Sequence, residues 1–278
     1  MPELPEVQSV VDALNRENII ARTVTGAAVY WTKTIADPTP RDFCRKIRGR
    51  TIRRITRRGK YIVFRLSGAM SLLIHLRMTG RLNLEPADCP RNPHEHVVFD
   101  IDQTTTLRFQ DTRKFGRIWL TDAPERILDR LGLEPLDEGF TFARLAGLLR
   151  RVNRRLKPLL LDQRFLAGLG NIYVDEALWT AGIHPLRISS SLNPEEIDAL
   201  HRAIPDVLRK GLANLGTSLG TGKGNFYLPG NRTGRNADRL NVFRRTGHAC
   251  PRCQGIIVRI VVGQRSTHIC SVCQREHA

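Results

Sequence analysis

The sequence lacks the features that would place it in or on a membrane. No apolar run approaches the roughly 18 residues that span a bilayer, and no basic amphipathic helix stands out. The first residues do not join a basic segment to an apolar stretch, so we expect no secretory signal. Internal repeats and a Walker phosphate loop are also missing. These absences predict a cytosolic protein without a membrane partner.

Acidic residues are scarce. The 27 Asp and Glu stand against 44 Lys and Arg, which leaves a formal charge of +17. Such an excess indicates a polyanionic partner, with nucleic acid first among the candidates. Between Arg41 and Lys60 there are ten basic residues and one acid. Both faces of a strand here would carry charge, which fits either a bound surface or a solvated edge strand.

Cysteines are few and clustered. Cys250 and Cys253 form one CxxC pair, Cys270 and Cys273 form another, and sixteen residues separate the pairs. This spacing is typical of a four-thiolate structural zinc site, whose closed shell leaves no position for catalysis. A redox dithiol pair is the alternative. In the cytosol we expect thiols rather than disulfides.

The residues between the two CxxC pairs have the pattern of a short hairpin. Residues 256–262 and 265–269 are strand-like and flank Gly263-Gln264. This hairpin is too small to fold unaided, so zinc would supply the missing stability. The other thiols, Cys44 and Cys89, belong to no motif.

The rest of the chain predicts an α+β protein. A helix is expected over about 5–16, followed by the short strands of an antiparallel β-sandwich from about residue 23 to residue 120. Helices are then expected over 144–154, 172–180 and 193–212. The helix over 5–16 would be buried along a stripe made by Val7, Val10, Val11 and Leu14, and Asn193 would cap the helix that follows it.

The chain opens with Met1-Pro2-Glu3, and removal of Met1 would leave Pro2 as a free secondary amine. A terminal amine has a pKa of about 8, well below that of lysine, so more of it is uncharged at neutral pH. Attack on an aldehyde-like carbon would give an iminium, which is an electron sink. The plainer interpretation is that Pro2 and Pro5 begin a helix, with Glu6 favoured in its first turn.

Taken in order, these features resemble the formamidopyrimidine-DNA glycosylase family over essentially the whole chain. Leu4 favours this branch over the related endonuclease VIII enzymes, in which glycine is usual at that place. The motifs that carry the resemblance are residues 2–7 (PELPEV), 58–61 (RGKY), 75–80 (HLRMTG), 111–116 (DTRKFG), 132–136 (GLEPL), 168–173 (GLGNIY) and the zinc hairpin with Gln264-Arg265.

The resemblance implies a domain order. An N-terminal helix and catalytic β-sandwich would occupy 1–121, with a linker over 122–140. A helix-two-turn-helix domain would follow over 141–240, including a lesion-covering loop over 216–241. The zinc hairpin would close the chain over 242–278.

The resemblance also implies roles near the amino terminus. Pro2 would be the nucleophile that attacks C1′ of a nucleotide flipped out of the duplex. Glu3 would be the acid and base around the sugar ring oxygen, and Glu6 would support the terminus. Lys60 would join this catalytic set by holding a phosphate near the lesion, although it could be one more lysine of a basic stretch.

Further residues are expected to bind DNA. Met78 and Phe115 would fill the space left by the extruded base, and Arg113 would reach the orphaned cytosine. Asn171 and Arg265, from separate domains, would hold a phosphate. Spacing alone favours simpler alternatives, in which Met78 and Phe115 are core residues and Asn171 caps an ordinary helix.

The implied function is base-excision repair: a monomeric, bacterial, nucleoid-associated glycosylase and abasic-site lyase with one structural zinc ion. It would remove 8-oxoguanine and formamidopyrimidines from double-stranded DNA. The alternatives are an endonuclease VIII-like enzyme for oxidised pyrimidines and a zinc-bearing protein that binds damage without cutting. Arg77, where glycine is usual, Thr112, where proline is usual, and the 216–241 segment depart from the family pattern.

Overall fold

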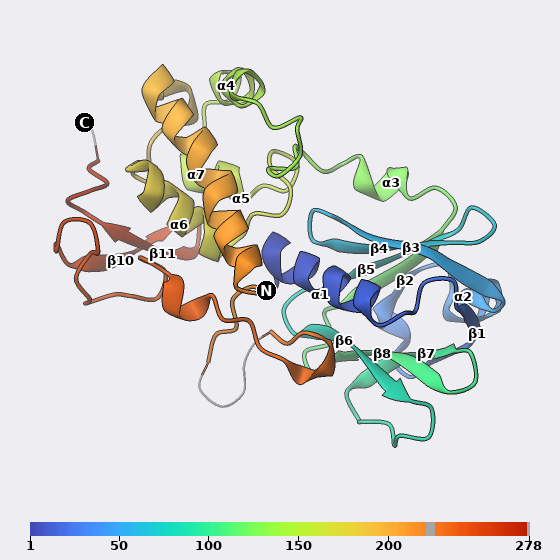
Figure 1. The fold of residues 1–278 in the computed structure, drawn as a ribbon. Helices are drawn as coiled ribbons and strands as arrows, with labels where there is room; N and C mark the ends of the chain where they lie inside the picture. Colours follow the sequence, from blue (N-terminus) through green and yellow to red (C-terminus); the bar gives the residue numbers. More distant parts are fainter. Residues whose placement is uncertain (221–225, 277–278) are drawn as a thin grey trace. The chain divides into compact units, whose positions relative to one another are not determined.

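A computed structural model describes residues 1–220 and 226–276 of the chain (Figure 1). The chain divides into two compact units. The first unit comprises Met1–Asp129 and Asn214–Arg235, and the second comprises Arg130–Ala213 and Asn236–Ala278. The finer domain boundaries expected from the sequence stay a prediction, and residues 221–225 of the expected lesion-covering loop lie outside the described residues.

The first unit is built on a nine-stranded sheet with the order β2-β9-β5-β4-β3-β1-β7-β8-β6. The strands β1 and β3 pair only at Thr23↔Thr51 and Val24↔Arg50, so the sheet has two halves that form two layers (Figure 1). All pairs are antiparallel except β2 with β9. The expected antiparallel sandwich is thereby confirmed. The strands are β1 (Thr23–Val29), β2 (Ile35–Asp37), β3 (Arg50–Arg58), β4 (Tyr61–Leu66), β5 (Ser71–His75), β6 (Gly80–Pro86), β7 (Glu95–Ile101), β8 (Thr105–Asp111) and β9 (Arg117–Thr121).

The helix α1 (Leu4–Arg16) joins the sandwich core through its predicted stripe. Val7, Val10, Val11 and Leu14 are buried in one cluster with side chains from both sheet halves. At roughly 1.5–3 kcal/mol per fully buried aliphatic side chain, this stripe supplies enough free energy to hold the amino terminus against the sheet. The short helices of this unit are η1 (Thr32–Thr34), α2 (Pro40–Ile47), α3 (Glu125–Leu128) and η3 (Pro229–Asn231).

The basic stretch from 41 to 60 forms the helix α2 and then the strand β3. Beyond its first residues, β3 pairs with β4 alone, so this part of the strand borders its half of the sheet, which agrees with the edge-strand alternative. Thr39 caps α2 by accepting a hydrogen bond from the backbone of Asp42. In β3 the register shifts between Ile52 and Arg54, which marks a β-bulge. Because a bulge breaks the alternation of faces, the adjacent Arg53 and Arg54 both reach solvent.

The second unit contains the predicted helices and hairpin. Its elements are α4 (Phe142–Arg150), α5 (Leu156–Leu161), α6 (Asn171–Ala181), η2 (Ser189–Ser191), α7 (Pro194–Ala213), η4 (Ala237–Arg239), β10 (Ile257–Val262) and β11 (Arg265–Cys270). The helix expected over 144–154 ends earlier, at Arg150, because Ser189 binds the backbone of Val152 and Arg154 and holds that segment extended.

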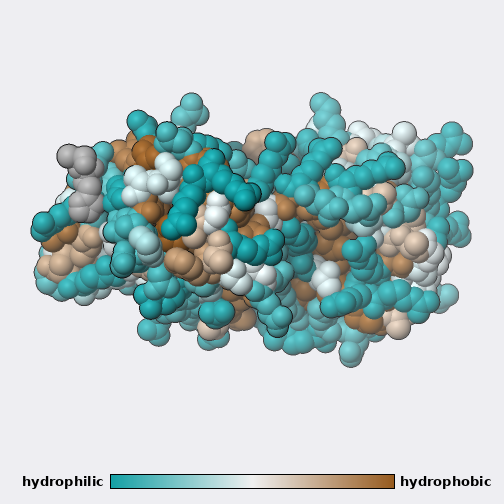
Figure 2. All heavy atoms as spheres, turned by 90° about the horizontal axis from the view of Figure 1, so that it is seen from above, coloured by the Kyte–Doolittle hydropathy of each residue, from teal (hydrophilic) through white to brown (hydrophobic). Residues whose placement is uncertain are grey.

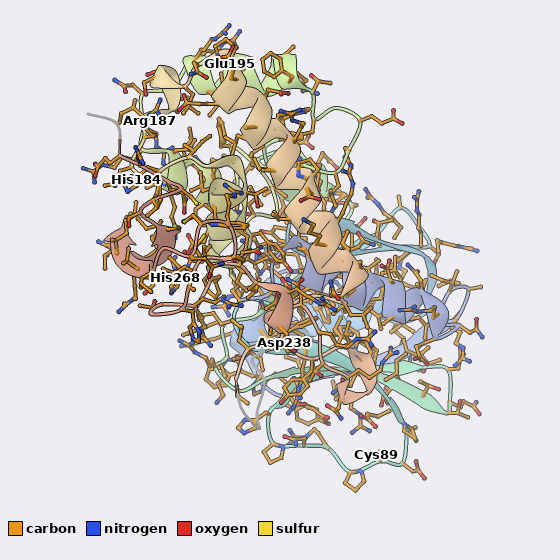
Figure 3. All side chains as sticks on the ribbon, turned by 60° about the vertical axis from the view of Figure 1, so that its left-hand side comes forward. Cys89, His184, Arg187, Glu195, Asp238 and His268 are labelled. Atoms are coloured by element: carbon orange, nitrogen blue, oxygen red, sulfur yellow. The ribbon has the colours of Figure 1, made fainter. Side chains whose placement is uncertain are left out.

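The start of α7 has the capping predicted from the sequence. The side chain of Asn193 accepts a hydrogen bond from the backbone of Glu196, and Glu196 accepts one from Asn193 in return. Figure 3 shows Glu195 in this first turn. Among the described residues, no helix has both the length and the hydrophobicity of a membrane span. The face drawn in Figure 2 is largely hydrophilic, with hydrophobic residues scattered in between.

Candidate active site and metal centre

The amino terminus is tied down through the carboxylate of Glu6. Glu6 is buried, and its two oxygens accept hydrogen bonds from the backbone N–H of Glu3 (2.8 Å) and of Thr217 (2.7 Å). The neighbouring Gly216 has a φ of +80°, and a Cβ there would lie 2.9 Å from the Glu6 side chain. Glu6 therefore fixes both the first turn of α1 and the start of the 214–235 segment, and Gly216 leaves the space for it.

Four charged side chains act on the terminal amine. Glu3 and Lys60 are buried like Glu6, and Lys60 lies in the turn between β3 and β4. Burial lowers the pKa of the Met1 amine; Glu3 and Glu6 oppose this shift, and the cations of Lys60 and Arg113 add to it. The structure thus gathers these predicted site residues around the amino terminus.

Met78, Arg113 and Phe115 lie at the surface. Met78 is 39% exposed and Phe115 is 47% exposed, so the alternative that they are core residues is wrong. The guanidinium of Arg113 lies over the Phe115 ring, 4.8 Å from its centroid. An exposed aromatic ring and a flexible thioether are suited to enter a base stack.

Asp111 organises the turn that carries Arg113 and Phe115. Its buried carboxylate accepts hydrogen bonds from the backbone of Arg113 (3.2 Å) and Gly116 (2.7 Å) and from the hydroxyl of Thr79. Because Thr79 follows Met78, one carboxylate links both exposed segments. Asp111 begins one of the motifs, but no pattern in the sequence predicts this role.

His75 supports the segment that carries Met78. Its Nδ1 accepts a hydrogen bond from the backbone N–H of Arg77 (3.0 Å). Burial, together with the cations of Arg77 and Lys60, lowers the pKa of His75 to about 3, so the ring is neutral. Arg77 has a φ of +54°, a conformation that favours glycine, which agrees with the glycine usual at this position in the family.

In the second unit, Asn171 and Arg265 come together. Asn171 is the first residue of α6 and Gly170 is the cap, so the expectation that Asn171 caps the helix is wrong. The Asn171 amide donates to the carbonyl of Ser266 (2.9 Å), the neighbour of Arg265. Arg265 is exposed and begins β11 directly after the turn at 263–264.

A buried network that the sequence analysis missed holds this region in place. Lys157 is fully buried and donates to Asp175 (2.5 Å) and to the same Ser266 carbonyl (3.0 Å). The other oxygen of Asp175 accepts hydrogen bonds from the backbone and ring of His268, which lies on the hairpin (Figure 3). The network links α5 and α6 to β11. A lone lysine and a lone aspartate gave no signal in the sequence.

The four clustered cysteines have the arrangement of a zinc site. Their sulfur atoms all lie within 4.8 Å of one another. The Sγ atoms of Cys250 and Cys273 are 3.9 Å apart and those of Cys253 and Cys270 are 3.4 Å apart. Four sulfurs at about 2.3 Å from a tetrahedral zinc ion would be about 3.8 Å apart. The residues therefore fit one structural zinc ion.

The surroundings of Cys250 favour a thiolate. Burial opposes its ionisation, but hydrogen bonds from the backbone of Arg252 and the indole of Trp179 outweigh this and lower its pKa to about 6. Burial and the neighbouring thiols instead raise the pKa of Cys273 to about 12. Ionisation of all four thiols at neutral pH thus requires a cation among them. The remaining cysteines, Cys44 and Cys89, are free, and Cys89 lies on the loop after β6 (Figure 3).

Known proteins with the same organisation are DNA glycosylases. Sequence models match the chain for the formamidopyrimidine-DNA glycosylase N-terminal domain over residues 1–118, for the H2TH domain of the same enzymes over 131–222, and for the zinc finger found in FPG and IleRS over 247–275. These matches define the class as DNA glycosylases with an H2TH domain and a zinc finger.

Individual relatives extend over the whole chain. The formamidopyrimidine-DNA glycosylase of Protochlamydia amoebophila is 45% identical over 276 residues, which cover 99% of this chain and 100% of the relative. A Lactococcus lactis FPG variant, solved with Fapy-dG-containing DNA, is 36% identical with a TM-score of 0.91. The Lactococcus lactis Fpg complex with abasic-site DNA is 35% identical with a TM-score of 0.90. Each alignment with these two structures covers 99% of this chain and 100% of the solved one.

The chain belongs to the formamidopyrimidine-DNA glycosylase family. This confirms the resemblance drawn from the motifs, and the cysteine geometry together with the zinc-finger match confirms one structural zinc ion as the cofactor.

Removal of zinc should unfold the hairpin. We expect Cys250→Ser, or chelation of the wild-type protein, to weaken binding to lesion duplexes at least about tenfold, because the four cysteines lose the ion that holds them together. Fluorescence anisotropy with parallel metal analysis measures this. Cys89→Ser removes a thiol outside the cluster and is the matched control. Unchanged affinity in metal-free protein would refute the structural role of zinc.

His75 should make the protein sensitive to acid. The unfolded chain binds a proton at His75 below about pH 6.5, whereas the folded chain does not do so until about pH 3. The free energy of unfolding should therefore decrease as the pH is lowered. Between pH 6.5 and 5, the contribution of His75 to this decrease approaches about 1.4 kcal/mol per pH unit. His75→Asn keeps an acceptor for the backbone of Arg77 and should flatten this slope in urea unfolding. His94→Asn, at an exposed histidine, should leave it unchanged; equal slopes in all three proteins would contradict the assignment.

Proposed function

We propose that this DNA glycosylase is bifunctional, and that it excises oxidised purines and then cleaves the strand through an imine formed at Pro2. The observation that carries the proposal is the cluster of Glu3, Glu6, Lys60 and Arg113 around the amino terminus. Removal of Met1 would expose the Pro2 nitrogen at this cluster. Burial lowers the pKa of the Met1 amine at this place, opposed by Glu3 and Glu6 and aided by Lys60 and Arg113. A similar shift at the Pro2 amine would keep a larger fraction of it uncharged and nucleophilic at neutral pH.

The reaction begins when the Pro2 nitrogen attacks C1′ of the extruded nucleotide. The N–C1′ bond forms as the glycosidic bond breaks. The base leaves with the bonding electron pair and takes up the proton that the Pro2 nitrogen loses. Glu3 protonates the ring oxygen as the sugar opens, which gives an iminium between Pro2 and C1′. Its buried position near the terminus suits a carboxyl that exchanges a proton with the sugar.

The iminium then drives strand cleavage. It acidifies the C2′ proton, and loss of that proton expels the 3′ phosphate by β-elimination. A second elimination, δ, expels the 5′ phosphate, and water releases the sugar remnant from Pro2. Lys60 holds a phosphate of the damaged nucleotide, and the amine is regenerated at the end.

The exposed residues of the first unit open the duplex. Met78 and Phe115 enter the space that the extruded nucleotide leaves, and Arg113 binds the cytosine that has lost its partner. Asn171 and Arg265 bind the backbone, a role that their shared link to Ser266 supports. Such phosphate contacts give affinity and register but read no sequence.

The substrate class follows from the family and from the DNA in related structures. We infer oxidised purines, 8-oxoguanine and formamidopyrimidines, because relatives are solved with Fapy-dG-containing DNA and Leu4 matches this branch. The enzyme acts as a monomer in the bacterial cytoplasm, where it associates with the nucleoid through DNA.

Borohydride trapping tests the nucleophile and the substrate together. We expect a covalent adduct with duplexes that carry 8-oxoguanine or an abasic site, a weaker one with oxidised pyrimidines, and loss of most of it in Pro2→Gly. Mass spectrometry of the same protein must show that Met1 is absent. No adduct with wild type, or an undiminished one with Pro2→Gly, would defeat the mechanism. Preference for oxidised pyrimidines would favour the endonuclease VIII-like alternative.

Glu3→Gln separates chemistry from binding. Loss of a general acid and base should slow base excision by about 10²–10⁴-fold while duplex affinity changes little. Glu17→Gln removes the same charge at the exposed end of α1 and should leave excision unchanged. Single-turnover excision and anisotropy give the two quantities. Equal loss of binding and excision in Glu3→Gln would indicate a structural role.

A further inference from the structure

The turn over 111–116 contains a strained residue between Arg113 and Phe115, the two residues proposed to contact the DNA. Lys114 lies between Arg113 and Phe115, and its φ is +59°. This left-handed conformation is costly for a residue with a side chain, so the surroundings must hold it. The side chains of Arg113 and Phe115 already pack on each other, 4.8 Å from guanidinium to ring centroid. The Lys114 side chain is thus available for a separate contact.

That contact is with Trp31, directly before η1. The ammonium of Lys114 lies over the indole ring, 4.1 Å from its centroid. Among the described residues, no carboxylate pairs with this ammonium and the indole N–H of Trp31 has no acceptor. The Trp31 ring therefore interacts with Lys114 through its face, which attracts a cation.

The backbone at Trp31 is connected to the same turn. The backbone N–H groups of Tyr30 and Trp31 donate to the carbonyl of His96 (2.8 and 3.4 Å). The ring of the buried His96 is hydrogen-bonded to the carbonyl of Asp111 (2.8 Å). One side of the turn is thus fixed by Asp111 and the other by the contact of Lys114 with Trp31, while the neighbouring Arg113 and Phe115 are exposed.

We propose that Trp31 is a positioning residue for opposite-base discrimination. Through Lys114 it holds the turn in the conformation that presents Arg113 to the orphaned base. This rests on the proposed function, in which Arg113 binds cytosine. Trp31 does not touch the DNA. Its loss loosens the turn and reduces the difference between cytosine and other bases opposite the lesion.

The test compares single-turnover excision of 8-oxoguanine opposite cytosine and opposite adenine. The ratio of the two rates does not depend on the fraction of folded enzyme, so a general loss of stability cannot change it. We expect Trp31→Ala to lower the ratio about threefold to tenfold. Trp31→Phe keeps an aromatic face and should restore most of it. Lys33→Met is the matched control, because Lys33 lies farther from the same ring (6.0 Å) and outside the turn.

A double-mutant cycle with Lys114→Met identifies the contact. If the two side chains act as one unit, Trp31→Ala combined with Lys114→Met should lower the ratio no more than either change alone. If Lys114 instead binds a phosphate, Lys114→Met weakens affinity for every duplex and Trp31→Ala leaves the ratio unchanged, which overturns the proposal. Failure of the wild-type protein to excise 8-oxoguanine from either duplex would defeat the proposed function itself. This result is distinct from an unchanged ratio.

Discussion

The position of the amino terminus among charged side chains is the constraint on which the candidate site of the first unit depends. A charged amine loses hydration when it is buried, so the fold must either compensate the charge or disfavour it. Here Glu3 and Glu6 compensate it, while burial and the cations of Lys60 and Arg113 disfavour it. The stripe on α1 supplies the free energy that keeps this unfavourable arrangement in place. A reactive amine is therefore a product of packing as much as of its own chemistry.

Periodicity and residue spacing were sufficient to predict those features of the fold that depend on residues close in sequence. The stripe on α1, the cap at Asn193 and the two CxxC pairs follow from helix geometry, capping and metal coordination, and the structure has all three. The rules failed where residues distant in sequence decide. Ser189 contacts the segment at which α4 ends, and the bulge in β3 breaks the period-two alternation at Arg53 and Arg54.

The candidate site shows the same division. Glu3, Lys60 and Arg113 could be named from motifs, and the structure gathers them near the terminus. The supporting groups could not, because Asp111 and Lys157 act through backbone carbonyls, backbone N–H groups and buried partners that no spacing reveals. The exposed fractions also decided between two alternatives. The sequence pattern alone favours Met78 and Phe115 as core residues, but both lie at the surface of the fold.

The hydrogen bond between Glu6 and Thr217 has a consequence for how such enzymes diverge. Glu6 accepts a hydrogen bond from the backbone N–H of residue 217, a group that every residue except proline provides. A Cβ at Gly216 would meet the Glu6 side chain and one at Gly234 would meet the backbone of residues 215 and 216, so both positions must stay small. This anchor at the amino terminus does not depend on the side chains of the other residues that follow Thr217. Sequence drift between 216 and 241 is thus compatible with a constant attachment, and selection there is free to act on what the segment contacts rather than on how it is held.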